Sequence, residues 1–316
     1  MSSPFPFLRL PGVVLCEVFK SMSIGEKIKL SFCSKKISTQ INIARLYSQK
    51  VIVSLDMLYL GIRVHSENNK DTFGILIRFN NGTINNLNIQ QYRIEGYTVP
   101  VIFCTKGINL FWKNHREGFL SVIRCLLKIF RCKFSINNDY NGDSYQPIIS
   151  KLFDLQLEFK MFTIRPNGST DQNSSWNQIS SNFGLVEDLR ISSSFKPSFR
   201  PVFTSWPQKI TIMNSYWFTV EYLLTCNCTT ITLGGSHLEN KNLDVIFLKW
   251  KAGGFPNLEY LYVESQSIEN NGTTVLGMNL PELDGKVIQT DDGSKKATIH
   301  TDYGRYGRIE LSVTPF

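Results

Sequence analysis

Apolar side chains recur at helical spacing in the first fifty residues. A first helix is predicted from five positions spaced i, i+1, i+4, i+5 and i+8, namely Val14, Leu15, Val18, Phe19 and Met22. Ser23 and Glu26 have the Ser-x-x-Glu form of a capping box and start a second helix. Apolar residues between Ile37 and Leu46 continue at helical spacing and predict a third. A unit of about forty residues rarely holds a stable core alone, so we expect these helices to dock on a partner.

Between residues 50 and 112 the pattern changes to alternating and β-branched runs, which are typical of strands. The predicted strands cover residues 51–55, 58–64, 73–79, 84–89, 99–103 and 108–112. This region is therefore expected to form a small β-rich sheet.

Beyond residue 112, a short apolar-x-apolar motif recurs six times, at residues 134–136, 162–164, 189–191, 210–212, 231–233 and 261–263. The copies are 21 to 30 residues apart, close to the roughly 20 to 29 residues of a leucine-rich repeat. Helical patterns lie between them, at residues 117–131, 147–155, 218–224 and 243–250. The expected fold class is α/β, in which three helices and a small sheet precede a leucine-rich-repeat-like solenoid of strands and helices. An ordinary α/β domain with irregular spacing is the alternative.

The end of the chain has the pattern of a hairpin. Residues 285–290 and 296–300 flank an Asp292-Gly293 turn, and residues 309–313 predict a further strand.

A solenoid of this kind buries one side of each short strand and exposes the alternate side chains on a concave surface. Eleven exposed residues are predicted from this alternation, and seven of them are the candidate substrate contacts: Arg165, Arg190, Thr211, Met213, Thr232, Tyr262 and Glu264. They are polar or mixed in charge and differ from one another. Such a surface favours recognition of a protein over chemistry on a small molecule.

The composition supports a folded protein, since 42% of the 316 residues are hydrophobic and 19% are charged. The net charge of +8 is uneven: residues 1–50 and 106–133 each carry +6, and residues 134–316 carry −4. A uniform nucleic-acid binder has a different pattern, so nucleic-acid binding is not expected. No window has the roughly 18 consecutive apolar residues of a membrane span, and the first residues lack a secretory signal. We therefore expect a location in the cytoplasm or nucleus, without secretion, and reduced, mostly buried cysteines.

The residues offer no recognisable catalytic motif. Cys226, Cys228 and His237 lack a second ligand pair at zinc-like spacing, and no glycine-rich phosphate-binding motif is present. The four histidines are scattered along the chain. We expect no catalytic residue, no metal and no cofactor. A hydrolase or transferase whose Cys or His is assembled from distant segments stays open as an alternative.

The order of residues in the N-terminal segment resembles an F-box. The resemblance rests on Phe7-Leu8-Arg9-Leu10-Pro11, Val14-Leu15, Val18, Met22, Glu26-Lys27-Ile28, Leu30-Ser31 and Cys33-Ser34-Lys35. It implies a three-helix unit that docks on the Skp adaptor of an SCF-type ubiquitin ligase and, through Skp, on a cullin scaffold. By position, the adaptor anchors or their supports are Leu10, Pro11, Val14, Leu15, Val18, Ile28 and Leu30. Gly12 departs from the acidic residue that many F-boxes carry there, which leaves the first helix without a favourable charge at its start.

Residues 217–228, 231–233, 243–250 and 255–263 are similar to the F-box-associated type 2 domain of a large nematode family. The two resemblances together imply an F-box over residues 5–48, a β-rich linking region over 50–112 and a substrate-receptor domain over 113–316. They imply a non-catalytic substrate receptor of a ubiquitin ligase, whose protein substrate binds the C-terminal domain. A stand-alone interaction module, with the helices packed on its own body, is the other interpretation.

Overall fold

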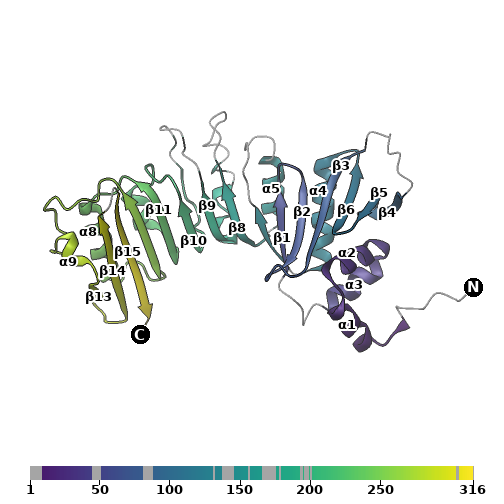
Figure 1. Ribbon diagram of the computed structural model, residues 1–316, viewed down its shortest axis with the longest axis horizontal. Helices are drawn as coiled ribbons and strands as arrows, with labels where there is room; N and C mark the ends of the chain where they lie inside the picture. Colours follow the sequence, from purple (N-terminus) through teal and green to yellow (C-terminus); the bar gives the residue numbers. More distant parts are fainter. Residues whose placement is uncertain are drawn as a thin grey trace, which may run out of the picture. The chain divides into compact units, whose positions relative to one another are not determined.

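The computed structural model describes residues 9–44, 51–80, 88–130, 132–136, 146–155, 157–165, 176–177, 179–192, 195, 199, 201–303 and 306–315. The chain forms two compact units, residues 1–138 and 139–316, and each is considered by itself (Figure 1). Among the described residues, no helix has both the length and the apolar character needed to cross a membrane.

The first unit begins with the three predicted helices, which are α1 (Gly12–Ser21), α2 (Ile24–Cys33) and α3 (Lys35–Ala44). The predicted capping box is confirmed, because the Glu26 backbone N–H donates to Ser23 Oγ over 3.2 Å and the Ser23 N–H donates to the Glu26 carboxylate over 2.8 Å. This exchange satisfies two backbone donors that the first turn of a helix leaves without partners. Each of α1 and α2 packs against α3.

A mixed sheet with the strand order β7-β1-β2-β3-β6-β5-β4 forms the rest of the first unit. Its strands are β1 (Val51–Asp56), β2 (Gly61–Ser66), β3 (Thr72–Phe79), β4 (Gln90–Ile94), β5 (Tyr97–Cys104), β6 (Gly107–Trp112) and β7 (Cys132–Ile136). Pairs β1–β7 and β3–β6 are parallel, and the other neighbours are antiparallel. Helix α4 (His115–Ile129) contacts β3, β4 and β6, so the predicted β-rich region includes a covering helix.

Two strand predictions in this region need revision. Residues 58–60 were expected in a strand, but they form a turn, and Leu60 has a φ of 47°. Residues other than glycine rarely adopt this left-handed backbone conformation. The turn consists largely of apolar residues, so the sequence pattern indicated a strand instead. The strand predicted over residues 84–89 falls mostly outside the described residues, and β4 was not predicted.

The sheet of the second unit has the order β13-β14-β15-β12-β11-β10-β9-β8. Its strands are β8 (Phe159–Ile164), β9 (Val186–Ile191), β10 (Lys209–Ile212), β11 (Thr230–Ser236), β12 (Tyr260–Ser265), β13 (Val287–Gln289), β14 (Lys295–Tyr303) and β15 (Gly307–Pro315). Strands β8 to β12 are parallel, and β15, β14 and β13 are antiparallel to their neighbours. The predicted hairpin is therefore confirmed as β13–β14.

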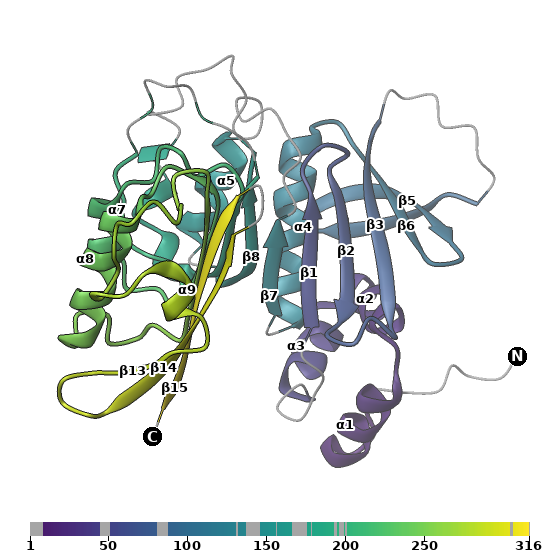
Figure 2. The ribbon, with the colours of Figure 1, turned by 60° about the vertical axis from the view of Figure 1, so that its left-hand side comes forward.

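Short helices connect these strands: α5 (Gln146–Asp154), the 3-10 turn η3 (Phe183–Leu185), α7 (Val220–Thr225), α8 (Asn240–Lys251) and α9 (Leu280–Leu283). Figure 2 shows α7 and α8 together on one face of the sheet. The opposite face of strands β8 to β12 carries the alternate side chains.

Copies of the repeated motif pair with one another in the same register across the second sheet. Its first apolar position forms one row of directly paired residues, Phe162, Leu189, Ile210, Ile231 and Leu261. All five side chains are buried. The remaining copy, residues 134–136, lies on β7 and pairs with β1 in the first unit. Five of the six copies therefore stack as consecutive parallel strands, each burying the same face.

Aromatic side chains between residues 176 and 222 form a cluster in the second unit. The Trp176 ring has its centroid 5.0 to 5.9 Å from those of four phenylalanines, Phe183, Phe195, Phe199 and Phe203. Trp217 and Phe218 extend this cluster toward Tyr222 on α7. Edge-to-face pairs of this kind add to the stabilisation from burial. Most of these rings are buried, so the cluster is part of the core of the second unit.

The compact units do not divide at residues 112 and 113, the boundary expected from the resemblances. Helix α4 and strand β7 pack with the first unit, whereas α5 and β8 belong to the second. The boundary of the receptor domain at residue 113 stays a prediction.

Two glycines that face each other on β3 and β6 give a test of this packing. A Cβ on Gly107 would lie 2.3 Å from the Gly74 carbonyl oxygen, whereas a Cβ on Gly74 would have its nearest neighbour at 3.7 Å. We expect Gly107→Ala to lower the free energy of unfolding of the first unit by about 1–3 kcal/mol, because the backbone at Gly74 must move to make room for the added methyl group. Gly74→Ala should leave it nearly unchanged. Urea unfolding followed by circular dichroism measures both, and equal effects would contradict the register.

Candidate functional site

Helix α2 is packed against the first sheet. The Ile24 backbone N–H donates to the Asp71 carboxylate over 2.7 Å. Gly25 lies against Phe73, where a Cβ would come within 2.5 Å of the ring. The Lys29 ammonium lies 5.6 Å from the Phe73 ring centroid and 5.4 Å from that of Phe103. These contacts fix one side of the three-helix unit on the body of the chain.

Charge at this contact is partly buried. The side chain of Lys27 is buried, and the loss of water lowers its pKa, while the nearby carboxylates of Asp71 and Glu26 act in the opposite direction. The hydrogen bonds from Ser23 lower the pKa of Glu26. Both groups belong to the first turn of α2, so the start of this helix is ordered by polar contacts as well as by packing.

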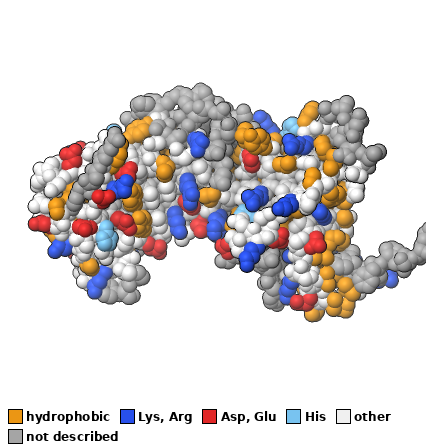
Figure 3. All heavy atoms as spheres, viewed as in Figure 1, with side chains coloured by type: hydrophobic (Ala, Val, Ile, Leu, Met, Phe, Trp, Pro, Cys, Tyr) orange, Lys and Arg blue, Asp and Glu red, His pale blue; other side chains and the backbone are white. Residues whose placement is uncertain are grey.

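Helix α1 presents apolar side chains to solvent. Val13 is 75% exposed and Val14 is 43% exposed, and Pro11 is exposed beside them. Within the first unit, Figures 1 and 2 both place α1 at the end of the helices that is farthest from the sheet. Figure 3 shows hydrophobic side chains gathered in the same part of the molecule. An apolar helix face without cover is the usual form of a docking surface for a partner.

The predicted adaptor residues divide between this surface and the core. Pro11 and Val14 are exposed, and Leu10, Val18 and Leu30 are half-buried. Leu15 and Ile28 are buried, so they support the helices rather than reaching a partner. The sequence pattern missed Val13 and Ile43, the latter 50% exposed on α3. Val13 could have been predicted from the sequence, because it directly precedes Val14 and widens the apolar face of the helix.

The start of α1 agrees with the interpretation of Gly12. The first turn of α1 has no acidic residue. Pro11 is the N-cap residue, and among the described residues no side chain accepts a hydrogen bond from the first N–H groups of the helix. The chain therefore begins this helix with backbone groups alone.

The seven residues predicted for the outward surface lie on strands β9 to β12 or at the ends of β8 and β10, and none is buried. One directly paired row crosses the sheet through Thr163, Arg190, Thr211, Thr232, Tyr262, Glu310 and His300. Met213, which follows β10, is 59% exposed. We call the exposed side of these strands the open face. The alternation along each strand separates this polar row from the buried apolar row.

Charged side chains on the open face take part in local polar contacts at two places along the strand order. On β8 and β9, Arg165 donates to Ser192 over 3.2 Å and Arg190 pairs with Asp188 over 2.7 Å. On β12 and β15, Glu264 accepts hydrogen bonds from Tyr262 over 3.2 Å and from Arg308 over 3.1 Å. Partial burial and the Glu264 carboxylate raise the pKa of Tyr262, so its hydroxyl remains a donor.

The residues considered for metal or thiol chemistry do not form a ligand set. In the part of the chain that the structure describes, no group of three His, Cys, Asp or Glu side chains is placed to hold a metal ion. Cys226 and Cys228 are buried, and their mutual contact and burial raise the pKa of Cys228. All seven cysteines are free thiols, but the expectation that most are buried is wrong. Cys33 and Cys104 are exposed because each lies at the end of its helix or strand.

One hydroxyl–imidazole contact bears on the alternative of a hydrolase. His65 Nε2 lies 3.0 Å from Ser54 Oγ, and His65 Nδ1 lies 3.0 Å from the Ser66 carbonyl oxygen. The two side chains belong to the paired strands β1 and β2. We interpret the contact as a cross-strand hydrogen bond that stabilises this pair.

Comparison with known proteins identifies two segments of the chain. Residues 7–49 match the F-box domain, and residues 198–263 match the family described as F-box associated. A stretch of 138 residues, 43% of the chain, is 28% identical to part of the E3 ubiquitin-protein ligase hecw-1 of Caenorhabditis elegans. The match covers 11% of that protein's length. No solved structure matches the chain.

The capping box gives a test of how α2 is held. We expect Ser23→Ala to lower the free energy of unfolding by about 1 kcal/mol at neutral pH. The pKa of Glu26 is lowered in the folded chain, so its contribution is present above its ordinary pKa and is lost as the pH falls through the folded value. The effect of the substitution should therefore shrink in acid.

Urea unfolding at neutral and acidic pH measures this difference. Ser21→Ala is the matched control, since among the described residues the Ser21 hydroxyl donates only to the Val18 carbonyl of its own helix. A Ser23→Ala effect no larger than that of Ser21→Ala would contradict the assigned role.

Proposed function

We propose that this chain, which joins an F-box domain to an F-box-associated segment, is the substrate-recognition subunit of an SCF-type ubiquitin ligase. F-box domains generally bind a Skp adaptor that is joined to a cullin scaffold, and both matched segments are typical of non-catalytic adaptor proteins. The observation that carries the proposal is the exposed apolar face of α1 inside the F-box match.

The adaptor contact is proposed for α1 and its neighbours. Helix α2 is occupied by the first sheet, whereas Pro11, Val13 and Val14 face solvent. A groove on the adaptor that accepts these side chains would remove apolar surface from water, which is the main source of affinity in helix-in-groove binding. The half-buried Leu10 and Val18 lie next to them and extend the same contact.

The substrate contact is proposed for the open face of the second unit. The in-register rows of β8 to β12 support a leucine-rich-repeat-like solenoid, in which alternate side chains form a recognition surface. Arg165, Arg190, Thr211, Met213, Thr232, Tyr262 and Glu264 are the proposed contact residues. Five of these residues, all except Arg165 and Met213, lie within strands, which hold their backbone at fixed spacing. Less backbone entropy is therefore lost on binding than in a loop.

Such a receptor needs no catalytic group of its own. Its effect is to hold a substrate lysine near a charged conjugating enzyme on the same scaffold, which raises their effective concentration. We propose that it acts in the cytoplasm or nucleus. The alternative, a stand-alone interaction module, requires α1 to remain uncovered in its working state.

The adaptor proposal is tested by co-purification of the full chain with a Skp adaptor. Val14→Asp places a charge in the proposed contact and should weaken capture more than tenfold. Val245→Asp is the control, since Val245 is 46% exposed on α8 of the second unit and lies outside the F-box match. Failure of the folded wild-type chain to bind, or equal loss in both variants, would contradict the proposal.

The substrate proposal is tested with a photo-crosslinking residue at Thr232 on the open face or at Leu248 on the outer side of α8. Proteins crosslinked only from Thr232 should become ubiquitinated in the reconstituted ligase, and Arg190→Glu should reduce this modification. The same crosslinked set from both positions, or modification that ignores Arg190→Glu, would contradict the assignment of the open face.

A further inference from the structure

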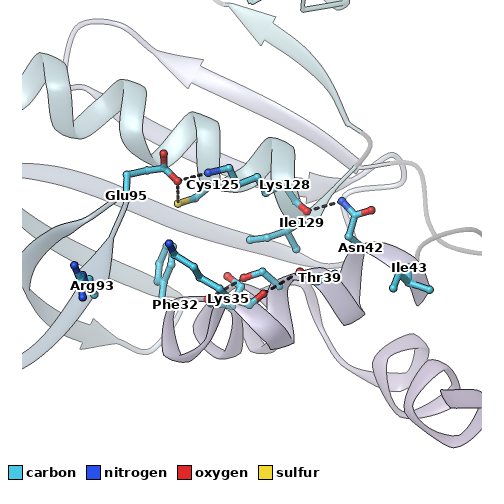
Figure 4. A pocket seen from close by; sticks show the side chains of 12 residues that line it. Phe32, Lys35, Thr39, Asn42, Ile43, Arg93, Glu95, Cys125, Lys128 and Ile129 are labelled. Carbon is cyan, nitrogen blue, oxygen red and sulfur yellow. Dashed lines mark hydrogen bonds and ion pairs between the residues drawn. The ribbon is translucent and has the colours of Figure 1, made fainter. Parts of the chain in front are cut away.

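A pocket of about 410 Å³, open to solvent, lies on the first unit where α2 and α3 meet α4 and the end of β4 (Figure 4). We call it the junction pocket. Phe32, Ile43 and Ile129 form its apolar surfaces, and charged side chains from three elements border it. Its size is in the range of small-molecule sites. It is distinct from the exposed face of α1 and from the open face of the second unit.

The neutral polar groups of the junction pocket are occupied by the protein's own backbone. Ser31 donates to the Ile28 carbonyl over 2.7 Å, and Thr39 donates to the Lys35 carbonyl over 3.1 Å. Asn42 Nδ2 donates to the Lys128 carbonyl over 2.5 Å. The two hydroxyl donors and one of the two N–H groups of Asn42 are therefore already used. The charged groups can form stronger hydrogen bonds than the neutral donor that remains.

The charged groups of the pocket are three cations and one carboxylate. Lys128 is paired with Glu95 over 2.5 Å, and the Cys125 thiol donates to the same carboxylate over 3.6 Å. Burial and the Glu95 charge raise the pKa of Cys125 to about 12, so this thiol stays neutral. Among the described residues, neither Lys35 nor Arg93 forms an ion pair. Figure 4 shows these two side chains on the same side of the pocket as Phe32.

We propose that the junction pocket binds a small molecule that carries a phosphate monoester beside an apolar group. Two cations without an acidic partner match the roughly two negative charges of a phosphate monoester. The guanidinium of Arg93 can form paired hydrogen bonds to phosphate oxygens, and Lys35 adds a mobile point charge. Phe32 and Ile129 offer the apolar group a surface that excludes water.

The ligand would join the helices to the body of the first unit. Lys35 belongs to α3 of the F-box, whereas Arg93 belongs to β4 and Lys128 to α4. An anion held between them adds contacts that only the folded junction offers, so it stabilises this packing by mass action. This inference does not depend on the proposed ligase role.

The test is calorimetric titration of the full chain with phenyl phosphate, with phenol and inorganic phosphate as the two partial probes. We expect phenyl phosphate to bind more tightly than either. Arg93→Gln and Lys35→Gln should each weaken its binding about tenfold or more, as expected for loss of a charged hydrogen bond. Glu95→Gln should tighten it, because Lys128 is released from its ion pair.

Lys36→Gln is the matched control, since it removes the same charge from the neighbouring position of α3 outside the pocket lining. The dissociation constant of the Lys36→Gln variant for phenyl phosphate should remain within about twofold of the wild-type value. Circular dichroism verifies the fold of each variant. Absence of binding at about 10 mM phenyl phosphate, or equal effects of Arg93→Gln and Lys36→Gln, would overturn the proposal. Equal affinity for phenyl phosphate and inorganic phosphate would overturn the apolar part of it.

Discussion

The packing of α2 on the first sheet is the contact on which the rest of the first unit depends. The absence of a side chain at Gly25 lets the helix approach Phe73, and Asp71 holds the first turn of the helix from the sheet side. This contact supplies the apolar cover that a unit of three short helices lacks. Because α2 faces the sheet and α3 contacts α4, α1 is the helix whose apolar face remains exposed. The exposed apolar face of α1, which is the proposed docking surface, is therefore a consequence of how the helices are attached to the rest of the first unit.

A different constraint organises the second unit. Parallel strands in register place one apolar residue of each copy in the same buried row, and the next residue of each strand then lies in a polar row on the opposite side. A one-residue slip would exchange the two rows, so burial fixes which side chains reach solvent. The polar row on the open face is therefore separate from the buried row that forms the core.

The sequence predicted the elements whose signals are local. The capping box at Ser23, the amphipathic face of α4 and the spacing of the repeated motif each depend on residues close in the chain. The turn at Leu58 to Leu60 was missed because apolar side chains there have the composition of a strand while the backbone turns. The junction pocket was out of reach for another reason: Lys35, Arg93 and Lys128 are about thirty to ninety residues apart and are brought together only by tertiary packing.

The central claim is that α2 is committed to the body of the chain while α1 remains available to an adaptor. Amide hydrogen exchange of the full chain, with and without a Skp adaptor, measures both helices in one experiment. The account predicts slow exchange in α2 in the free chain and new protection over Gly12–Ser21 when the adaptor is added. Unchanged exchange in α1, or protection confined to α2, would contradict it.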